Sequence, residues 1–256
     1  AGHGTVQAVA DRLASAPTIY PLPQLLVLGG GRSNVIAAEC DGCGDILGKL
    51  ETALRQCRES ATPSVARRHV LCIEQAQALA RHGFFLAAGI PDYAIRACHR
   101  HRRNGRAGLR ESDAATAWTL VKIALPAMLG MRAPTLDALR VEVSGREPLA
   151  KPVRWLLATT LQRPRGIVDP FAQHGEGLLR FTAIAASGPA FWARLPSIVA
   201  GRFTPAMQTG DYLSGRCDSL RVHGLSSYTL DGEEFAADPA HPVTISRGAP
   251  LTFLMP

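Results

Sequence analysis

The chain has 256 residues, of which 46% are hydrophobic, and these figures predict a folded protein with one large core or two smaller ones. They exclude a chain that is disordered throughout. The formal net charge is +7, mostly from arginine, so nucleotides, nucleic acids and anionic membrane surfaces are the favoured classes of partner. Charge alone does not choose among them.

The first residues of the chain lack the charged region and the apolar core of a secretion signal, and we expect the chain to begin within a domain. Thr5 can cap a helix that runs to about Ser15, because the apolar residues between Val6 and Leu13 recur at helical spacing. The glycine-containing segment before Thr5 would then lie at the N-terminus of that helix.

Residues 24–28 form a short apolar run that ends in three glycines, which predicts a buried strand entering a tight loop. A second helix can begin at Ser33. Asp45 opens a third helix, whose apolar residues lie on one side and whose charged residues lie opposite. These strand, loop and helix units predict an α/β half-domain.

Six cysteines lie in a chain that is too long and too rich in core residues to need a disulfide framework, which favours the reducing cytoplasm. Cys40 and Cys43 have the spacing of a redox or zinc motif. No second pair follows at the spacing of a zinc ribbon, so two buried or loop thiols are the favoured interpretation.

Beyond residues 60–64 the sequence changes to short strands separated by Gly, Pro and Asp turns. We expect strands at residues 69–74, 84–88, 139–144, 153–160, 179–185, 219–223, 228–230, 243–246 and 251–254. The predicted fold class is therefore α/β plus β. A partial Rossmann-like nucleotide-binding half over residues 1–66 would be followed by a β-sandwich domain with inserted helices over residues 67–256.

Two segments of the second half could face a membrane. Residues 96–110 are dense in arginine and could attract an anionic leaflet, although a solvated basic loop explains them equally well. Residues 114–131 are apolar but contain Lys122 and Pro126, which predicts a helix that is buried or lies on a membrane.

Two glycine loops could bind phosphate. The segment Gly2-His3-Gly4-Thr5 would point backbone N–H groups and the positive end of a helix dipole at one place. The segment Gly29-Gly30-Gly31-Arg32-Ser33-Asn34 repeats the arrangement after a strand and adds a guanidinium and an amide. Two such loops about 25 residues apart are more informative than either loop alone.

These loops resemble those of a known family. Ala1-Gly2-His3-Gly4-Thr5 before a helix resembles the Gly-Gly-Asp-Gly-Thr nucleotide loop of diacylglycerol, sphingosine and related lipid kinases. The second loop resembles the family's Pro-x-Gly-Thr-x-Asn motif before an alanine: Gly31, Asn34 and Ala37 match, whereas Gly29 replaces proline and Arg32 replaces threonine. Asp231-Gly232-Glu233, followed by terminal strands, is similar to the family's Asp-Gly-Glu signature. Without this resemblance, a hairpin turn with solvated acids would be the favoured interpretation of the last segment.

The resemblance implies an ATP-dependent lipid kinase of phospholipid metabolism that phosphorylates a hydroxyl group of diacylglycerol or a related lipid, with Mg²⁺. Glu233 would be the general base, accompanied by Asp231 as a catalytic residue. The nucleotide would bind to Gly2, His3, Gly4, Thr5, Gly30, Gly31, Arg32 and Asn34. The resemblance also implies that a first βαβ unit of the family, roughly 60 residues, is lacking here.

The sequence assigns no metal ligand. His3 stands where the family has aspartate, and an imidazole cannot supply a hard anionic oxygen. Arg32 could partly compensate by contacting a phosphate directly. The segment His174-Gly175-Glu176-Gly177 is similar to an acidic segment that the family uses for a structural Mg²⁺, but it keeps a carboxylate only at Glu176.

Two other functions stay open. The chain could be a catalytically inactive relative that binds nucleotide or lipid, or a soluble small-molecule kinase resembling NAD kinases. Nucleic acid is not an expected partner, because aromatic residues do not alternate with the arginines. We expect a cytoplasmic protein that contacts the inner face of the membrane transiently.

Overall fold

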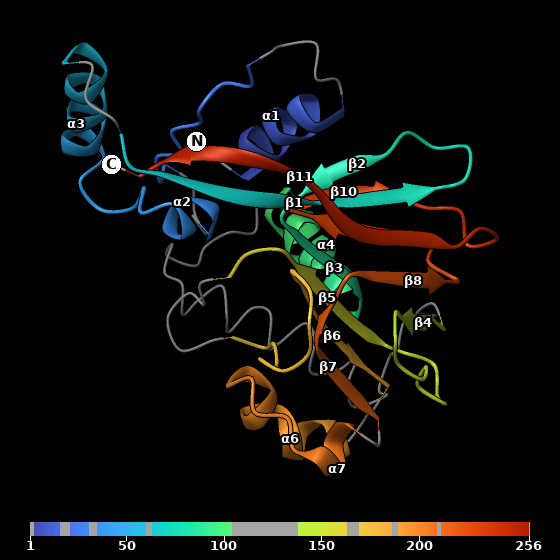
Figure 1. Ribbon diagram of the computed structural model, residues 1–256. Helices are drawn as coiled ribbons and strands as arrows, with labels where there is room; N and C mark the ends of the chain where they lie inside the picture. Colours follow the sequence, from blue (N-terminus) through green and yellow to red (C-terminus); the bar gives the residue numbers. More distant parts are fainter. Residues whose placement is uncertain are drawn as a thin grey trace.

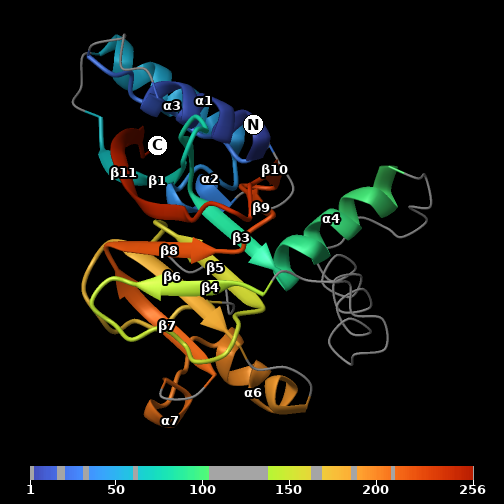
Figure 2. The same ribbon diagram turned by 90° about the vertical axis from the view of Figure 1, so that its right-hand side faces the viewer.

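The computed structural model describes residues 3–15, 21–30, 35–59, 63–103, 138–162, 169–185, 189–208 and 211–255. In these residues the chain forms two antiparallel sheets with helices around them (Figures 1 and 2). The helices are α1 (His3–Ser15), α2 (Val35–Glu39), α3 (Ile46–Arg58), α4 (Ile90–Arg103), α6 (Pro189–Val199) and α7 (Pro205–Gln208).

The first sheet has the strand order β2-β1-β11-β8-β4. Its strands are β1 (Val65–Gln75), β2 (Arg81–Gly83), β4 (Arg140–Val143), β8 (Ser219–His223) and β11 (Val243–Leu254). The long strands β1 and β11 pair from Val65 with Leu254 to Gln75 with Val243, with one register shift on the way. This ribbon carries the N-terminal helices at one end (Figure 1).

The second sheet has the order β10-β9-β3-β5-β6-β7. Its strands are β3 (Phe85–Gly89), β5 (Trp155–Thr159), β6 (Leu179–Ile184), β7 (Tyr212–Cys217), β9 (Ser227–Leu230) and β10 (Glu233–Ala236). The hairpin β9–β10 lies at one edge of this sheet, beside β3.

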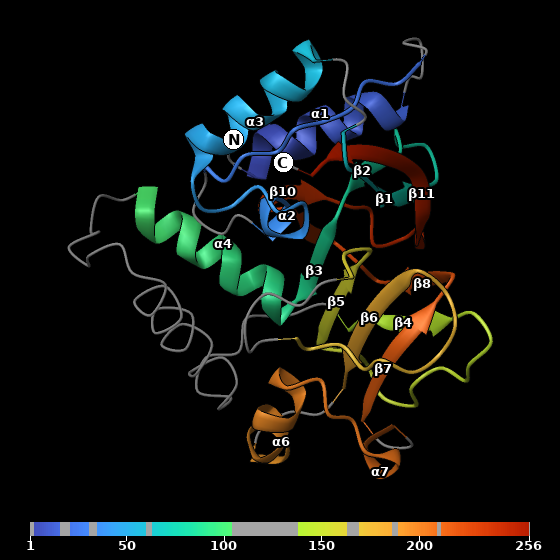
Figure 3. The ribbon, with the colours of Figure 1, turned by 60° about the vertical axis from the view of Figure 1, so that its left-hand side comes forward.

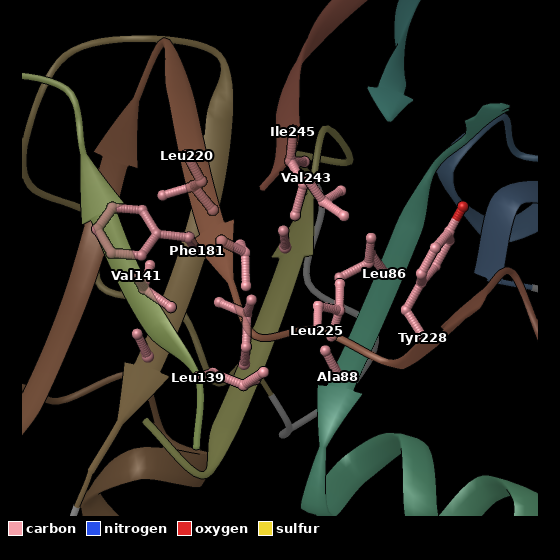
Figure 4. Packing of buried hydrophobic residues seen from close by; sticks show 14 of the residues in the cluster. Leu86, Ala88, Leu139, Val141, Phe181, Leu220, Leu225, Tyr228, Val243 and Ile245 are labelled. Atoms are coloured by element: carbon pink, nitrogen blue, oxygen red, sulfur yellow. The ribbon is translucent and has the colours of Figure 1, made fainter. Parts of the chain in front are cut away.

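The main core lies between residues of both sheets. Leu86 and Phe181 of the second sheet and Val141, Leu220 and Val243 of the first are buried in one cluster. Figure 4 shows these side chains directed toward one another from strands on both sides. Alternation of side chains along each strand gives each sheet the apolar face that this core requires.

A second core fixes the N-terminal helix α1. Its residues Val6, Ala10 and Leu13 recur at helical spacing and are buried against Phe84, between β2 and β3, and Phe253 of β11. In all three ribbon views α2 lies beneath α1 (Figures 1, 2 and 3). The predicted division near residue 66 stays a prediction, as do the Rossmann-like character of the first half and the sandwich arrangement.

Two local predictions for the N-terminal region are wrong. Helix α1 begins at His3, so Thr5 lies within its first turn and is not its cap. Residues 24–28 do not form a strand, because Leu25 makes an isolated parallel bridge with Phe253 at the end of β11 and its neighbours join no ladder. The predicted start of the third helix at Asp45 is confirmed, and Asp45 is its N-cap, because its side chain accepts a hydrogen bond from Gly48 N.

The predicted strands of the second half are confirmed with shifted ends, except that residues 243–246 and 251–254 belong to one strand, β11. Strands β2, β7 and β10 and helix α4 were not predicted. The predicted helix over residues 114–131 and the arginines beyond residue 103 lie outside the described residues. Among the helices that the structure describes, none is both long and apolar enough to span a bilayer.

Candidate functional site at the β9–β10 hairpin

The turn of the β9–β10 hairpin is built by Asp231 and Gly232. Leu230 pairs with Glu233 across the hairpin, so these two residues form the whole loop. Both have positive φ, 49° at Asp231 and 88° at Gly232. Asp-Gly is the favoured sequence for such a turn, because glycine and aspartate tolerate the left-handed region. A hairpin turn, the interpretation favoured without the family resemblance, is therefore present, but Asp231 is not solvated.

Asp231 is directed into the protein. Its side chain is buried and accepts hydrogen bonds from Phe84 N and Phe85 N, both at 2.9 Å. Its own N–H donates to Phe85 O at 2.8 Å. Burial raises the pKa of the Asp231 carboxyl to about 7, and the two backbone hydrogen bonds oppose that rise. The carboxyl group thus anchors the turn to the start of β3.

Glu233 follows the turn and is exposed. Its carboxylate lies against Gly4 in the first turn of α1, where a Cβ added to Gly4 would overlap Glu233 Oε1. Gly4 therefore leaves the space that the carboxylate fills. The hairpin and the N-terminal helix, more than 200 residues apart in the sequence, meet at this contact.

Polar side chains of α1 hold the helix on β2 and so fix the position of Gly4. Asp11 Oδ1 accepts a hydrogen bond from His82 N at 2.8 Å and lies 3.1 Å from His82 Nδ1. Gln7 Nε2 donates to His82 O at 3.1 Å. Both backbone groups of His82 are therefore bound by one helix, as a neighbouring strand would bind them.

The short segment from His82 to Phe85 connects helix α1 with the turn of the β9–β10 hairpin. His82 binds α1, and Phe84 and Phe85 bind Asp231. Gly83 lies between them, and a Cβ added there would be 2.6 Å from Asp231 Oδ2 and 2.7 Å from the Leu230 side chain. A glycine at position 83 is needed for this close approach of the turn.

The N-terminus of α1 has the electrostatic character of an anion site. The first four N–H groups of an α-helix have no partner within the helix, and the helix dipole makes this end positive. Gly4 and Thr5 belong to this first turn. The arrangement can bind a phosphate group and places a carboxylate next to it.

The second glycine loop can be followed only in part. Gly29 N donates to Gly42 O at 2.8 Å, and Gly30 N donates to Leu28 O at 2.9 Å. Gly2, Gly31, Arg32 and Asn34 lie outside the described residues, and for His3 the structure describes the backbone alone. Val27 before the loop and Ile36 after it share the core of α1.

Two other segments that the sequence singled out can be located among the described residues. Cys40 is buried and Cys43 is half-buried. Glu176 is exposed between two glycines of positive φ. No group of three or more His, Cys, Asp or Glu residues is placed to hold a metal ion within the described part of the chain.

Several residues that position the site were not predicted from the sequence. Gln7 and Asp11 had no signal beyond lying four residues apart on one helix. Asp92 and Arg96 form an ion pair at 2.8 Å within α4, and their spacing of four residues was a usable signal. The sequence grouped Arg96 with arginines that could attract a membrane or form a solvated basic loop, whereas its side chain is turned toward the β9–β10 hairpin.

No protein-family model matches the sequence, and no curated protein matches it. Solved structures do match, and three of them come from Bacillus anthracis str. Sterne. One is described as a diacylglycerol kinase (TM-score 0.54, 12% identity) and covers 100% of this chain and 74% of its own. Two are described provisionally as diacylglycerol kinases, each with a TM-score of 0.58.

Of these two, one is 12% identical and covers 100% of this chain and 75% of its own. The other is 11% identical and covers 100% of this chain and 76% of its own. The structural similarity shows the fold, whereas sequence identity this low leaves the activity open. The resemblance expected from the two glycine loops and the Asp-Gly-Glu segment is confirmed at the level of the fold, which is similar to that of these bacterial diacylglycerol kinases.

Proposed function

We propose that the protein is a kinase that transfers the γ-phosphate of ATP to a hydroxyl group of diacylglycerol or a related lipid, with Glu233 as general base. The contact between Glu233 and Gly4 carries this proposal, because it puts a basic group beside a helix N-terminus suited to phosphate. The shared fold with proteins described as diacylglycerol kinases supports the choice of reaction.

The N-terminal helix would bind the phosphates. Backbone N–H groups at Gly4 and Thr5 have no partner within α1 and would donate to phosphate oxygens, together with the proposed ligands Gly2 and His3. From the second loop, Gly30, Gly31, Arg32 and Asn34 would complete the nucleotide site. A guanidinium at Arg32 can bind a phosphate through two parallel hydrogen bonds.

Glu233 would accept the proton of the acceptor. As the lipid oxygen forms its bond to the γ-phosphorus, the bond from that phosphorus to ADP breaks, and the hydroxyl proton passes to the Glu233 carboxylate. Glu233 is exposed, so a bulky substrate can reach it. Asp231 would hold the turn in place and so position Glu233. Both of its carboxyl oxygens accept hydrogen bonds from backbone N–H groups, one from Phe84 and one from Phe85 at the start of β3.

The residues present fit a magnesium ion that arrives with the nucleotide. In the part of the site that the structure describes, Glu233 is the accessible carboxylate at the helix N-terminus, which is too few oxygens for a cage built by the protein. Mg²⁺ bound to ATP would neutralise phosphate charge during transfer. Its charge would also reduce repulsion between the phosphates and Glu233.

Phosphoryl transfer from labelled ATP to diacylglycerol in mixed micelles tests the proposal. We expect transfer by the unmodified chain and a loss of at least about 100-fold in kcat for Glu233→Gln, which keeps the size of the side chain but cannot accept the proton. Glu74→Gln is the matched control, because Glu74 is exposed on β1 and lies outside the site.

The same assay separates the other functions. Transfer to NAD without transfer to any lipid would support a soluble small-molecule kinase. Binding of ATP with no transfer to either acceptor would support an inactive relative. Equal turnover by the unmodified chain and Glu233→Gln would reject Glu233 as the base.

A further inference from the structure

The strand β10 presents two neighbouring acids to two different helices. Glu233 lies against Gly4 of α1. Side chains alternate between the faces of a strand, and the next residue, Glu234, contacts α4. Its Oε2 lies 3.3 Å from Arg96 Nη1, and its Oε1 lies 3.0 Å from His99 Nδ1. Figures 2 and 3 show β10 between α1 and α4.

Arg96 bridges the two strands of the hairpin. Its Nη2 donates to Tyr228 O on β9 at 3.0 Å and to Phe235 O on β10 at 2.9 Å. Tyr228 and Phe235 are partners in the register of the hairpin, and their rings are stacked with centroids 5.5 Å apart. The Arg96 guanidinium therefore binds both strands of the hairpin, and on β10 it does so two residues after Glu233.

Asp92 fixes the orientation of that guanidinium. Both of its carboxylate oxygens accept from Arg96 Nε, at 2.9 and 2.8 Å. The same oxygens accept from the hydroxyl groups of Ser227 and Thr229 on β9. Asp92 is 3% exposed, so solvent and salt screen this cluster far less than a surface ion pair. The Arg96 guanidinium thus makes five hydrogen bonds to four residues in a fixed planar geometry, which lysine cannot reproduce.

We propose that Arg96 is a positioning residue: it clamps the β9–β10 hairpin to α4 so that the Glu233 carboxylate stays beside Gly4. The inference rests on the proposed function, because the carboxylate so held is the proposed base. Arg96 itself does not touch the reacting groups in this scheme. A displacement of α4 would move the hairpin and, with it, the base.

Hydrogen–deuterium exchange of the full chain tests the clamp without any assay of activity. In Arg96→Met, which keeps an unbranched side chain but loses the charge and all donors, we expect the amides of residues 227–236 to exchange at least about tenfold faster. Arg100→Met is the control, because Arg100 lies one turn further along α4, is exposed and stacks over Tyr93. It should leave exchange in the hairpin unchanged.

Kinetics test the consequence for the base. With ATP and diacylglycerol micelles, Arg96→Met should lower kcat by about tenfold or more and leave the KM for ATP within about twofold, because the clamp aligns the base and does not bind nucleotide. Arg96→Lys should recover part of kcat, since it restores the charge but cannot reach both carbonyl oxygens. If the loss came only from lower stability, kcat would not be expected to fall in the order unmodified chain, Arg96→Lys, Arg96→Met while the KM for ATP stayed the same.

Glu234→Gln provides a second route if Arg96→Met does not fold, because it keeps the Asp92–Arg96 pair and removes one charge from the clamp. It should show the same changes at smaller size. Unchanged exchange in the hairpin in both variants, or faster exchange with unchanged kcat, would overturn the proposal. A chain that transfers no phosphate at all would reject the proposed function, whereas the exchange result would still decide whether Arg96 holds the hairpin.

Discussion

Two acids of the same hairpin, Asp231 in the turn and Glu233 at the start of β10, occupy opposite environments. Asp231 is buried, with its carboxyl group bound by two backbone N–H groups. Glu233 is exposed and lies against a glycine of another element. The same short segment thus contains a buried residue that anchors the turn and an exposed residue that lies beside a helix N-terminus.

The division follows from the turn itself. Positive φ at Asp231 and Gly232 reverses the chain within two residues. The Asp231 side chain therefore enters the protein, while the Glu233 side chain lies on the side of β10 that faces α1. The anchored residue determines where the accessible one lies. The comparison therefore predicts that changes at Asp231 affect stability, whereas changes around Glu233 affect turnover.

The largest expected effect is on stability as a function of pH. Folding raises the pKa of Asp231 from 3.8 to about 7, so its stabilising contribution is complete below about pH 4 and is lost as the pH rises through 7. The difference in unfolding free energy between the unmodified chain and Asp231→Asn should fall by up to about 4 kcal/mol between about pH 4 and about pH 8. Urea unfolding at several pH values measures it.

Glu233→Gln is the control for that titration. Because Glu233 is exposed, the substitution should change the unfolding free energy by less than about 0.5 kcal/mol. If the difference for Asp231→Asn instead grew with rising pH, the carboxyl would be ionised in the folded protein, and its two N–H partners would outweigh the effect of burial.

A smaller effect, on activity, is expected from Gly4→Ala. The new methyl group would overlap Glu233 Oε1 and displace the carboxylate, which should lower kcat by about tenfold. Alanine is a better helix former than glycine, so stability should stay the same or rise by up to about 1 kcal/mol. Kinetics and thermal unfolding of the same preparation separate the two quantities.

Gly48→Ala serves as the control for Gly4→Ala, because Gly48 is also a helical glycine of the first turn, in α3, and its close neighbour is the Asp45 cap rather than Glu233. It should leave kcat unchanged. If kcat were also unchanged in Gly4→Ala, the position of the Glu233 carboxylate beside the helix N-terminus would not matter for turnover. The contrast between Asp231 and Glu233 would then fail.

The helices show how far sequence periodicity reaches. It predicted both α1 and α3, which are amphipathic and of equal length. Helix α1 buries its apolar side against the sheets, whereas α3 buries Ala53 and exposes Leu47, Leu50 and Leu54. Periodicity specifies which side of a helix is apolar, because that depends on local spacing. It does not specify what covers that side.

For the site, the sequence supplied the glycine loops and the Asp-Gly-Glu segment but not their environment. The roles of Asp231 and Glu233 were assigned together, although their environments differ. The difference depends on Phe84 and Phe85, nearly 150 residues away, and on the approach of Gly4. Strand β10 was missed because Glu233-Glu234-Phe235-Ala236 has no apolar alternation, and its pairing with β9 forms it.

A crystal structure of the protein with a non-hydrolysable ATP analogue and Mg²⁺ tests the central claim most directly. The account predicts the phosphates at the N-terminus of α1, hydrogen-bonded to backbone N–H groups of its first turn, with the Glu233 carboxylate facing the γ-phosphate. Nucleotide bound elsewhere, with Glu233 on a different face of the molecule from the phosphates, would contradict it.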